Sequence, residues 1–303
     1  MLKFVNLMEG NRFQKDFDIH GEDMDWDSSN YILEPIPNDG KRCQCLIKSD
    51  SIEISAKCTA DNPFLVSSKV PQVIRDLKNI NVPYNTLLDG YLSFRGSRDS
   101  NEMLSVLRGS DEKALTRQKH DKIVFFLTDI IFYNNKLLSE FPLSYRKNFI
   151  RDFVQEKEHV RINEYYLNSK INKYKDLKKE FDCFYFKDLD SFYTFRTSKR
   201  WMILKDHKTF FVVVMEMIPG KGRCANTCGS LKVGQFINNE LKYISNISGM
   251  TDEIRDFFFR NHCIGKVIEI KAFERTKNGK FDEARFVALR KDLDPKNCIF
   301  EQE

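Results

Sequence analysis

The 303-residue chain has no apolar run long enough to cross a bilayer. Its longest apolar stretches, residues 123–132 and 210–217, reach only about half of the roughly 20 residues that a spanning helix needs. The N-terminus also lacks the basic start, the apolar run and the small-residue cleavage site of a secretory signal peptide. We therefore expect an intracellular protein, whether cytoplasmic, nuclear or encoded by a phage or virus, without a membrane partner.

The eight cysteines lack the two-pair spacing of a zinc site. Cys43 with Cys45, and Cys224 with Cys228, could each begin such a site, but no second pair follows at ligand spacing. Because Cys43 and Cys45 lie two residues apart in a predicted strand, they would point to the same face as packing residues. Cysteines of an intracellular chain are typically reduced thiols, so we expect neither disulfides nor a metal site.

Charge of one sign does not dominate the chain. The net charge is +5 and the pI is near 8.6, with 41% hydrophobic and 31% charged residues. Such a composition is typical of globular domains, and the length suits one large domain or two ordinary ones. The mild excess of positive charge permits binding to a polyanion but does not require it, because the placement of charge matters more than its total.

Apolar periodicity predicts an α+β arrangement in the first two thirds of the chain. Strands are expected within residues 31–58, 85–95, 122–133, 183–187 and 201–205, and helices at 70–77, 144–157 and 162–179. From residue 210 the pattern changes to short strands separated by glycines, with one helix at 252–261. Five or so short strands with one helix suit an OB-type barrel. We place the boundary near His207, giving domains of residues 1–206 and 207–303.

Several segments, in order, resemble ATP-dependent DNA ligases. Residues 31–42 resemble the first ligase motif, K-x-D-G-x-R, and residues 126–146 resemble the third motif and the helix after it. The segments that resemble the ligase OB domain and its closing motif are 229–241, 248–255, 265–270 and 285–295. The resemblance covers nearly the whole chain from Tyr31 onward. It implies an α+β fold, in which an adenylyltransferase domain of ATP-grasp-like antiparallel sheets precedes a C-terminal OB-fold β-barrel.

The resemblance fails at the residue that would carry the chemistry. Asp39, Gly40 and Arg42 match the first motif, but the lysine that becomes adenylylated in ligases corresponds to Pro37. Proline has no side-chain amine, so it cannot attack an α-phosphate or form a phosphoramidate. A covalent nucleotide intermediate at this position is therefore excluded.

Other motif positions have also lost the residue type that the resemblance implies. Ala56 stands where ligases have an arginine, while Tyr91 and Asp182 stand where they have glutamates. Ile203 and Leu293 replace lysines aimed at phosphate or leaving group. The pocket residues that remain are Asp39, Gly40, Arg42, Asp129, Lys187, Lys205 and Arg290. Because adenylyl transfer needs acids on Mg²⁺ and cations on the triphosphate, we expect no cofactor, with residual ATP or Mg²⁺ binding as the alternative.

A displaced lysine is the alternative to an inactive protein. Lys41 lies beyond the Asp-Gly turn and would have to reach back, and Lys48 lies in a later turn in the wrong register. The related mRNA capping group shares the lysine motif, so Pro37 argues against that activity too.

The surviving pocket residues also have a structural interpretation. Asp39 and Gly40 could persist because the turn needs a glycine and a capping acid. Asp129, Lys187 and Lys205 could form buried ion pairs with one another instead of binding nucleotide.

Binding to nucleic acid is the property most easily kept when catalysis is lost. The resemblance implies cationic faces on both domains that contact duplex phosphates with little sequence preference. The candidate contacts are Lys170, Lys173, Lys175, Lys178, Lys179, Arg196, Lys199, Arg200, Lys221 and Arg223. Acidic residues interleave them, so ordinary solvated faces are the alternative.

The leading hypothesis is a catalytically inactive DNA-ligase-like protein. It would bind nucleic acid, chiefly duplex DNA, or serve as a non-catalytic subunit of a replication, repair or transcription assembly. One alternative is a divergent ATP-dependent ligase with a displaced lysine. The other is a purely structural subunit that docks proteins on the apolar remnant of the pocket, which Pro37, Tyr91, Cys183, Ile203 and Leu293 would make less polar.

Overall fold

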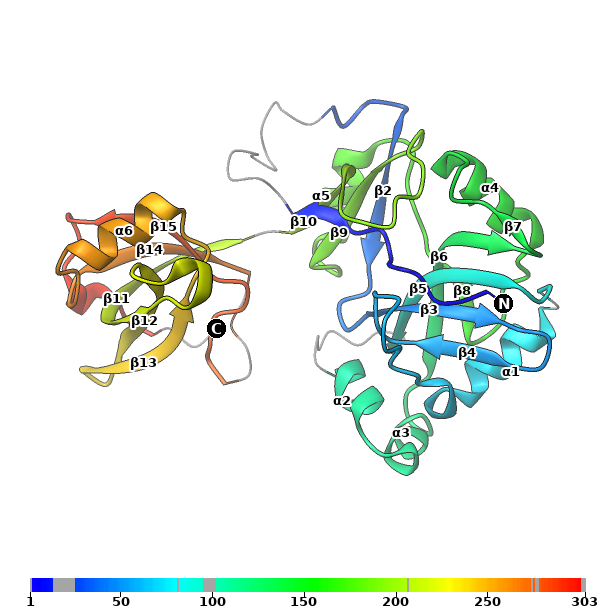
Figure 1. Ribbon diagram of the computed structural model, residues 1–303, viewed down its shortest axis with the longest axis horizontal. Coiled ribbons are helices and arrows are strands. Elements are labelled where there is room, and N and C mark those ends of the chain that lie inside the picture. Colours follow the sequence, from blue (N-terminus) through cyan, green and yellow to red (C-terminus); the bar gives the residue numbers. More distant parts are fainter. Residues whose placement is uncertain are drawn as a thin grey trace. The chain divides into compact units, whose positions relative to one another are not determined.

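A computed structural model describes residues 2–12, 25–80, 82–94, 102–205, 207–273, 275 and 278–300. The chain divides into two compact units, Met1–Lys205 (unit 1) and Asp206–Glu303 (unit 2) (Figure 1). Both units combine helices with mainly antiparallel sheets, as the sequence predicts. Within the described ranges, no helix is both long and apolar enough to span a membrane.

The described residues of unit 1 form two sheets and five α-helices. Its strands are β1 Gly10–Arg12, β2 Tyr31–Ile36, β3 Lys41–Ile47, β4 Ile52–Ser55, β5 Thr86–Phe94, β6 Ile123–Tyr133, β7 Lys136–Leu137, β8 Val160–Ile162, β9 Cys183–Asp188 and β10 Ser198–Lys205. Its helices are α1 Pro71–Asn79, α2 Glu102–Arg108, α3 Asp111–Arg117, α4 Leu143–Phe153 and α5 Lys170–Leu177. A short 3₁₀ turn, Ser67–Lys69, precedes α1.

The larger sheet has the strand order β4-β3-β5-β6-β7, and β8 pairs in parallel with β6. Asn134 and Asn135 join β6 to β7, and both have positive φ, at 47° and 66°. A two-residue connection with both residues in the left-handed region is the hairpin turn that asparagine favours, because its twist matches that of the strands. The Asn-Asn dipeptide therefore ends β6 and reverses the chain.

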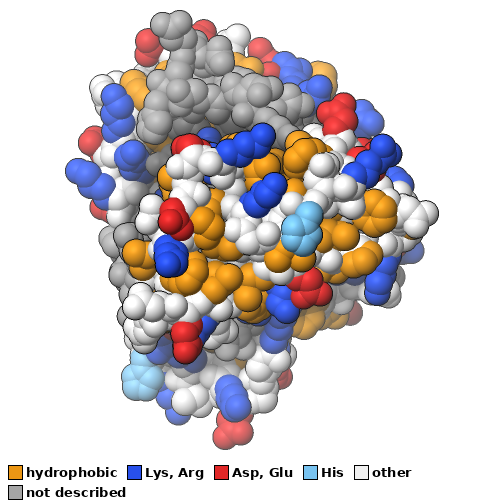
Figure 2. Space-filling view, turned by 90° about the vertical axis from the view of Figure 1, so that its left-hand side faces the viewer, with side chains coloured by type: hydrophobic (Ala, Val, Ile, Leu, Met, Phe, Trp, Pro, Cys, Tyr) orange, Lys and Arg blue, Asp and Glu red, His pale blue; other side chains and the backbone are white. Residues whose placement is uncertain are grey.

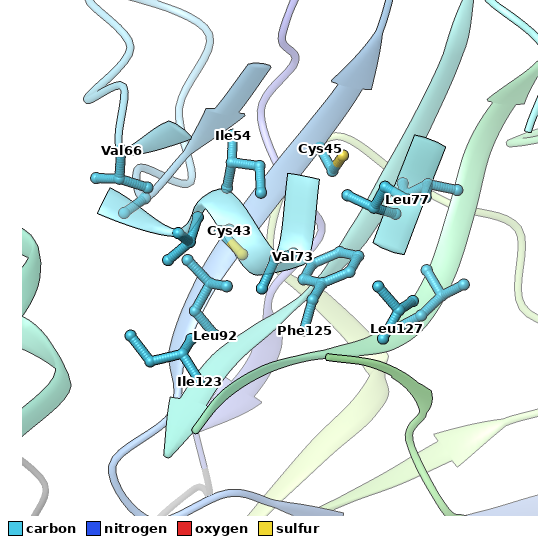
Figure 3. Close-up of a cluster of buried hydrophobic side chains, with 14 of the residues drawn as sticks. Cys43, Cys45, Ile54, Val66, Val73, Leu77, Leu92, Ile123, Phe125 and Leu127 are labelled. Atoms are coloured by element: carbon cyan, nitrogen blue, oxygen red, sulfur yellow. The ribbon is translucent and has the colours of Figure 1, made fainter. Parts of the chain in front are cut away.

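One face of this sheet packs against helices. Cys43 and Cys45 on β3, with Phe125 on β6, contact Val73 and Leu77 of α1 in a buried apolar cluster (Figure 3). The predicted packing role of the two cysteines is confirmed, and burial raises the pKa of the Cys45 thiol well above its usual value. The side chains that alternate with them point to the opposite face of the sheet.

The smaller sheet has the order β1-β10-β9-β2, with β1 parallel to β10 and the other pairs antiparallel. Its outer face packs on α5 through Tyr174, which contacts Leu33 and Phe184. The predicted helix at 162–179 is wrong in its first part. Ile162 ends β8, and the helix begins only after Ser169, whose φ of 51° is left-handed and cannot continue a right-handed helix.

In the part of unit 2 that the structure describes, five strands form an antiparallel sheet accompanied by one α-helix. Its elements are β11 Lys208–Pro219, β12 Cys228–Ile237, β13 Glu240–Ile247, α6 Asp252–Arg260, β14 Val267–Ala272 and β15 Arg285–Arg290, with 3₁₀ turns at Gly222–Cys224 and Pro295–Asn297. The strand order is β13-β12-β11-β14-β15. Thr251 caps α6 by accepting a hydrogen bond from the Ile254 N–H, and Phe258 anchors the helix in the core of the unit.

Candidate functional site between the two sheets of unit 1

The inner faces of the two sheets of unit 1 pack against each other. Ile32 of β2 and Trp201 of β10 share a buried cluster with Leu46 of β3, Leu87 of β5 and Ile131 of β6. Charged side chains alternate with these apolar ones along the same strands. We call this region the inter-sheet layer, and it contains several of the motif positions of unit 1.

The turn that contains Pro37 connects β2 to β3. The Gly40 N–H donates to the Pro37 carbonyl at 2.8 Å, and a Cβ at Gly40 would lie 2.7 Å from that oxygen. Asp39 is buried and accepts hydrogen bonds from the Phe94 N–H at 2.9 Å and from the Ser93 hydroxyl. Asp39 and Gly40 therefore both have a structural role, because the turn needs a glycine and the acid attaches it to the end of β5.

Arg42 forms a buried bidentate pair with Asp89 on the neighbouring strand. Its Nε and Nη2 atoms donate to the two carboxylate oxygens at 3.0 and 2.6 Å. The Tyr193 hydroxyl donates to the same carboxylate at 2.8 Å. Burial alone would lower the pKa of Arg42, but the negative charge of Asp89 raises it well above its usual value. The arginine of the first motif is thus held by a protein carboxylate.

Asp129 is paired in the same way with Arg146 of α4, and both side chains are completely buried. Arg146 donates from Nε and Nη2 at 2.7 and 2.9 Å. Its Nη1 atom also donates to the carbonyls of Phe141 and Ser191. Burial opposes ionisation, but the charge of Arg146 and its hydrogen bonds hold the pKa of Asp129 below its usual range.

Glu34 of β2 lies between two lysines. Lys147 of α4 donates to one carboxylate oxygen at 2.5 Å, and Lys187 of β9 donates to the other. The Lys187 ammonium also lies 4.2 Å from the centre of the Trp201 ring. Burial, reinforced by the like charge of Lys147, lowers the pKa of Lys187 to about 8. Asp129 and Lys187 are therefore buried ion-pair members as expected, but their partners are Arg146 and Glu34 rather than each other.

These ion pairs make the free energy of unfolding depend on pH in the acid range. The pKa values of Glu34 and Asp129 are lowered on folding because the cationic partners outweigh the effect of burial, so the unfolded chain binds more protons than the folded one at low pH. Their stabilisation is present above the ordinary carboxylate pKa and is lost as the pH falls through the folded values. Asp39, whose pKa burial raises, acts in the opposite direction and reduces the net slope.

We expect the free energy of unfolding, measured by urea titration, to fall as the pH drops below about 4.5. The control is Glu216→Gln, which removes a carboxylate exposed at the surface and should leave the slope unchanged. A profile that stays flat from neutral pH to about 3 would contradict the ion pairs described above.

The N-terminal segment, residues 2–10, packs into the inter-sheet layer, so that part of the space between the two sheets is occupied by the protein itself. Met8 is 0% exposed, and Phe4 and Leu7 belong to the same buried cluster. The Gln44 side chain exchanges two hydrogen bonds with the backbone of Val5, at 2.7 and 2.8 Å. In Figure 1 the dark blue segment passes from the larger sheet to β10 of the smaller one. No motif in the sequence indicates a role for this segment.

Gly10 is where the segment approaches the smaller sheet most closely. A Cβ there would lie 2.5 Å from the Tyr185 ring and 2.8 Å from the Ile203 side chain. Gly10→Val is therefore expected to lower the free energy of unfolding by about 1–3 kcal/mol, because the added methyl groups overpack the layer. Chemical denaturation would measure the change. Glu9→Val, at the exposed neighbouring position, should stay within about 0.5 kcal/mol of wild type, and equal effects of the two variants would contradict this packing.

A cavity of about 680 Å³ lies beside the first-motif turn and is called the Pro37 cavity below. Pro35, Pro37, Phe126, Ile162 and Phe181 form much of its apolar wall. Its acidic lining residues are Glu156, Glu158, Glu164 and Glu180, and Arg161 is the one cation among the described residues that line it. Pro37 thus borders a cavity with an excess of negative charge.

Solved structures of similar fold are DNA ligases. No protein-family model matches the sequence. A Lig E DNA ligase superimposes with a TM-score of 0.66 at 15% identity, over 96% of this chain and 100% of that one. The ligase domain of LigD from M. tuberculosis gives a TM-score of 0.52 at 17% identity, over 99% and 100% of the two chains. Pmar-Lig gives 0.65 at 18% identity, over 86% of this chain and 64% of its own length. This chain has the fold of DNA ligases.

On this ligase fold, several motif positions of unit 1 lie together in the inter-sheet layer. Tyr91 is buried there, and Ile203 packs against the same cluster. Ala56 instead belongs to the core on the helix-covered face of the larger sheet. Asp182 lies just before β9, where its N–H donates to the Asn38 side chain at 2.9 Å. Lys205 ends β10.

The two closing-motif positions lie in unit 2. Arg290 ends β15 and pairs with Asp292 at 2.7 Å and with Glu269 at 2.9 Å. Leu293 packs against a small buried cluster that includes Val213 and Cys298.

The predicted nucleic-acid contacts are mostly exposed. Those with exposed side chains are Lys173, Lys175, Lys178, Lys179, Arg196, Lys199, Arg200, Lys221 and Arg223. Lys170 is a correction: it is 1% exposed, and its ammonium donates to the carbonyls of Ser28 and Leu167 at 2.9 and 2.8 Å, so it cannot reach a phosphate. Figure 2 shows Lys and Arg side chains spread over one face with acidic and apolar ones between them.

Proposed function

We propose that this protein is a non-catalytic member of the DNA-ligase fold that binds nucleic acid, either alone or as a subunit of a replication, repair or transcription assembly. One observation carries the proposal. The inter-sheet layer, where Tyr91 and Ile203 replace motif residues, is packed with the chain's own N-terminal segment and with ion pairs internal to the protein. A nucleotide would have to displace both.

The charges of unit 1 also disfavour a bound triphosphate. Arg42, Lys147 and Lys187 each have a buried carboxylate partner, so none is available to a phosphate without leaving another charge unpaired. Breaking one such pair costs on the order of 3–5 kcal/mol. The Pro37 cavity has four glutamates against one arginine and would repel phosphate. ATP and Mg²⁺ are therefore not proposed as cofactors.

We also propose that unit 2 is an OB-type barrel. When its strands β11 to β15 are numbered 1 to 5 along the chain, they lie side by side in the order 3-2-1-4-5. The helix α6 follows the third strand in the sequence and precedes the fourth. An isolated parallel bridge joins Ser248, just after β13, to Arg285 of β15, which are the two edge strands. Closure between these edges is what an OB barrel requires.

Nucleic acid would contact the exposed lysines of unit 1. Lys173, Lys175 and Lys179 lie on and just after α5, and their side chains are exposed. Each phosphate that a lysine neutralises releases about one counterion, so affinity falls steeply with salt. The known chemistry of DNA ligases, together with the shared fold, makes nicked or intact duplex DNA the first ligand to test.

The triple variant Lys173→Gln/Lys175→Gln/Lys179→Gln is expected to weaken binding to a labelled nicked duplex and to reduce the salt slope by about 2–3. Fluorescence anisotropy over a salt series measures both quantities. The matched control replaces Lys78, Lys113 and Lys119, which are equally exposed lysines outside the proposed surface. An equal loss of duplex affinity in both triple variants would show that net charge, and not this surface, causes the effect. If wild type does not bind the duplex even at low salt, the nucleic-acid role is contradicted.

A displaced nucleophile has less support than inactivity. Lys48, in the β3–β4 turn, donates to Glu53 at 2.6 Å. Lys41 begins β3 immediately before Arg42, whose guanidinium is held by Asp89. The docking role is the stronger second candidate, because the Pro37 cavity offers an apolar wall to a protein partner.

A further inference from the structure

The Pro37 cavity has the character of a binding site rather than a packing defect. Its volume of about 680 Å³ is within the range of pockets that enclose small ligands or several side chains. Its wall comes from separate parts of unit 1: Pro37 after β2, Phe126 of β6, Ile162 of β8 and Phe181 after α5. Asn163 donates to the Pro35 carbonyl at 3.0 Å and ties two of these walls together.

The acids at this cavity are only partly neutralised. Glu156 pairs with Arg161 at 3.2 Å, and Glu158 pairs with Lys122. Across the described residues, no cation lies within ion-pairing distance of Glu164 or Glu180. These two carboxylates therefore supply the uncompensated charge of the cavity.

Tyr166 is close enough to Glu164 and Glu180 for their negative charges to affect its hydroxyl. Its hydroxyl donates to Glu164 at 2.9 Å. Burial, the hydrogen bond to Glu164 and the negative charges of Glu164 and Glu180 raise the pKa of Tyr166 to about 12. The ring of Tyr166 already attracts one cation, since the Lys173 ammonium lies 5.2 Å from its centre.

We propose that the Pro37 cavity receives a basic segment of a partner protein, in which a lysine or arginine side chain is flanked by an apolar residue. The apolar flank would pack against Phe126, Ile162 and Phe181. The cationic group would lie between Glu164 and Glu180, where charge complementarity favours it and excludes nucleic acid phosphate. The proposal rests on the proposed function in one respect, which is that no nucleotide occupies this side of the first-motif turn.

Arginine and lysine suit this combination of charge and aromatic surface. Their aliphatic stems bury well on apolar walls while the charged head reaches an acid at the rim. A cation over Tyr166 or Phe181 would add a cation–π contribution. A segment rich in acids would meet like charge at the same rim and would be rejected.

The test uses the full-length protein and an immobilised positional-scanning hexapeptide library. We expect at least one position to select lysine or arginine over aspartate and glutamate, with an aromatic or aliphatic residue selected beside it. The best peptide should bind Glu164→Gln/Glu180→Gln about tenfold or more weakly than wild type. Glu112→Gln/Glu253→Gln, which removes the same charge at exposed sites elsewhere, should bind it as wild type does.

Several results would overturn the proposal. They are a library screen in which no peptide position prefers particular residues, a screen in which acidic residues are preferred, and a basic preference that Glu164→Gln/Glu180→Gln retains. Binding of free spermidine without peptide selection would instead mark a small-amine site, and self-association lost in that variant would mark a second copy as the occupant. Nicked-duplex binding, measured on the same proteins, separates this proposal from the proposed function. If wild type selects the basic peptide but does not bind the duplex, only the nucleic-acid role is contradicted. If ATP binds in the Pro37 cavity, both proposals are contradicted.

Discussion

Pro37→Lys is expected to leave the protein unlabelled when it is incubated with radioactive ATP or GTP and Mg²⁺. The new amine would stand at the turn between the two sheets but would lack the surroundings that adenylyl transfer needs. Cations are missing at positions 56, 203 and 293, and each such contact is worth on the order of 2–4 kcal/mol in a transition state. Together these losses would reduce the rate by on the order of 10⁴-fold or more.

A stepwise series gives this prediction a control. Pro37→Lys alone, and Pro37→Lys with Ile203→Lys, are compared with wild type after thermal unfolding has shown that all three are folded. Covalent labelling of the single variant near one nucleotide per chain would contradict the claim that the layer around Tyr91 and Ile203 excludes nucleotide. It would show that Pro37 is the one defect that matters.

Glu34→Gln is expected to have the largest effect on stability, a loss of about 3–5 kcal/mol. Glu34 is the shared counterion of Lys147 and Lys187, and all three side chains are buried. The neutral amide leaves two ammonium groups close together without a compensating charge. Urea unfolding at pH 7 measures the loss. Glu216→Gln breaks a pair to Lys232 whose side chains are 59% and 39% exposed, so it should cost less than about 1 kcal/mol.

The source of the Glu34 effect can be separated from simple loss of packing. Replacing Glu34, Lys147 and Lys187 together by methionine removes every charge of the group while keeping apolar volume. Buried ion pairs replaced by apolar side chains are often neutral in stability, so we expect this triple variant to recover much of the loss. A triple variant less stable than Glu34→Gln would show that the charges are not the cause.

Much of the fold can be predicted from local sequence pattern. Alternation along residues 41–47 predicts β3, because Cys43 and Cys45 face one side and Arg42 and Gln44 the other. The continuous apolar run of β6 likewise indicates a buried strand. The predicted helix at 162–179 forms only from Lys170 onward, and Ile162 belongs instead to β8, a short parallel strand whose pairing with β6 overrides local helix propensity.

The candidate site is less accessible to sequence reasoning than the strands. Pro37 and the other motif changes follow from the sequence, but the partners of Asp129 and Lys187 depend on α4, which brings Arg146 and Lys147 into the inter-sheet layer. In the sequence Lys170 resembles a surface lysine, but in the structure its ammonium donates a hydrogen bond to the carbonyl of Ser28, 142 residues away along the chain. The apolar residues Phe4, Leu7 and Met8 are a local signal that the N-terminal segment is buried, but they do not reveal where the segment packs.

The most direct test of the central claim is to incubate the wild-type protein with α-labelled ATP or GTP and Mg²⁺, and in parallel with a nicked duplex. The account predicts no stable label on the protein and no sealed strand, together with salt-dependent binding of the duplex. A covalent nucleotide on any side chain, or a joined nick, would contradict it.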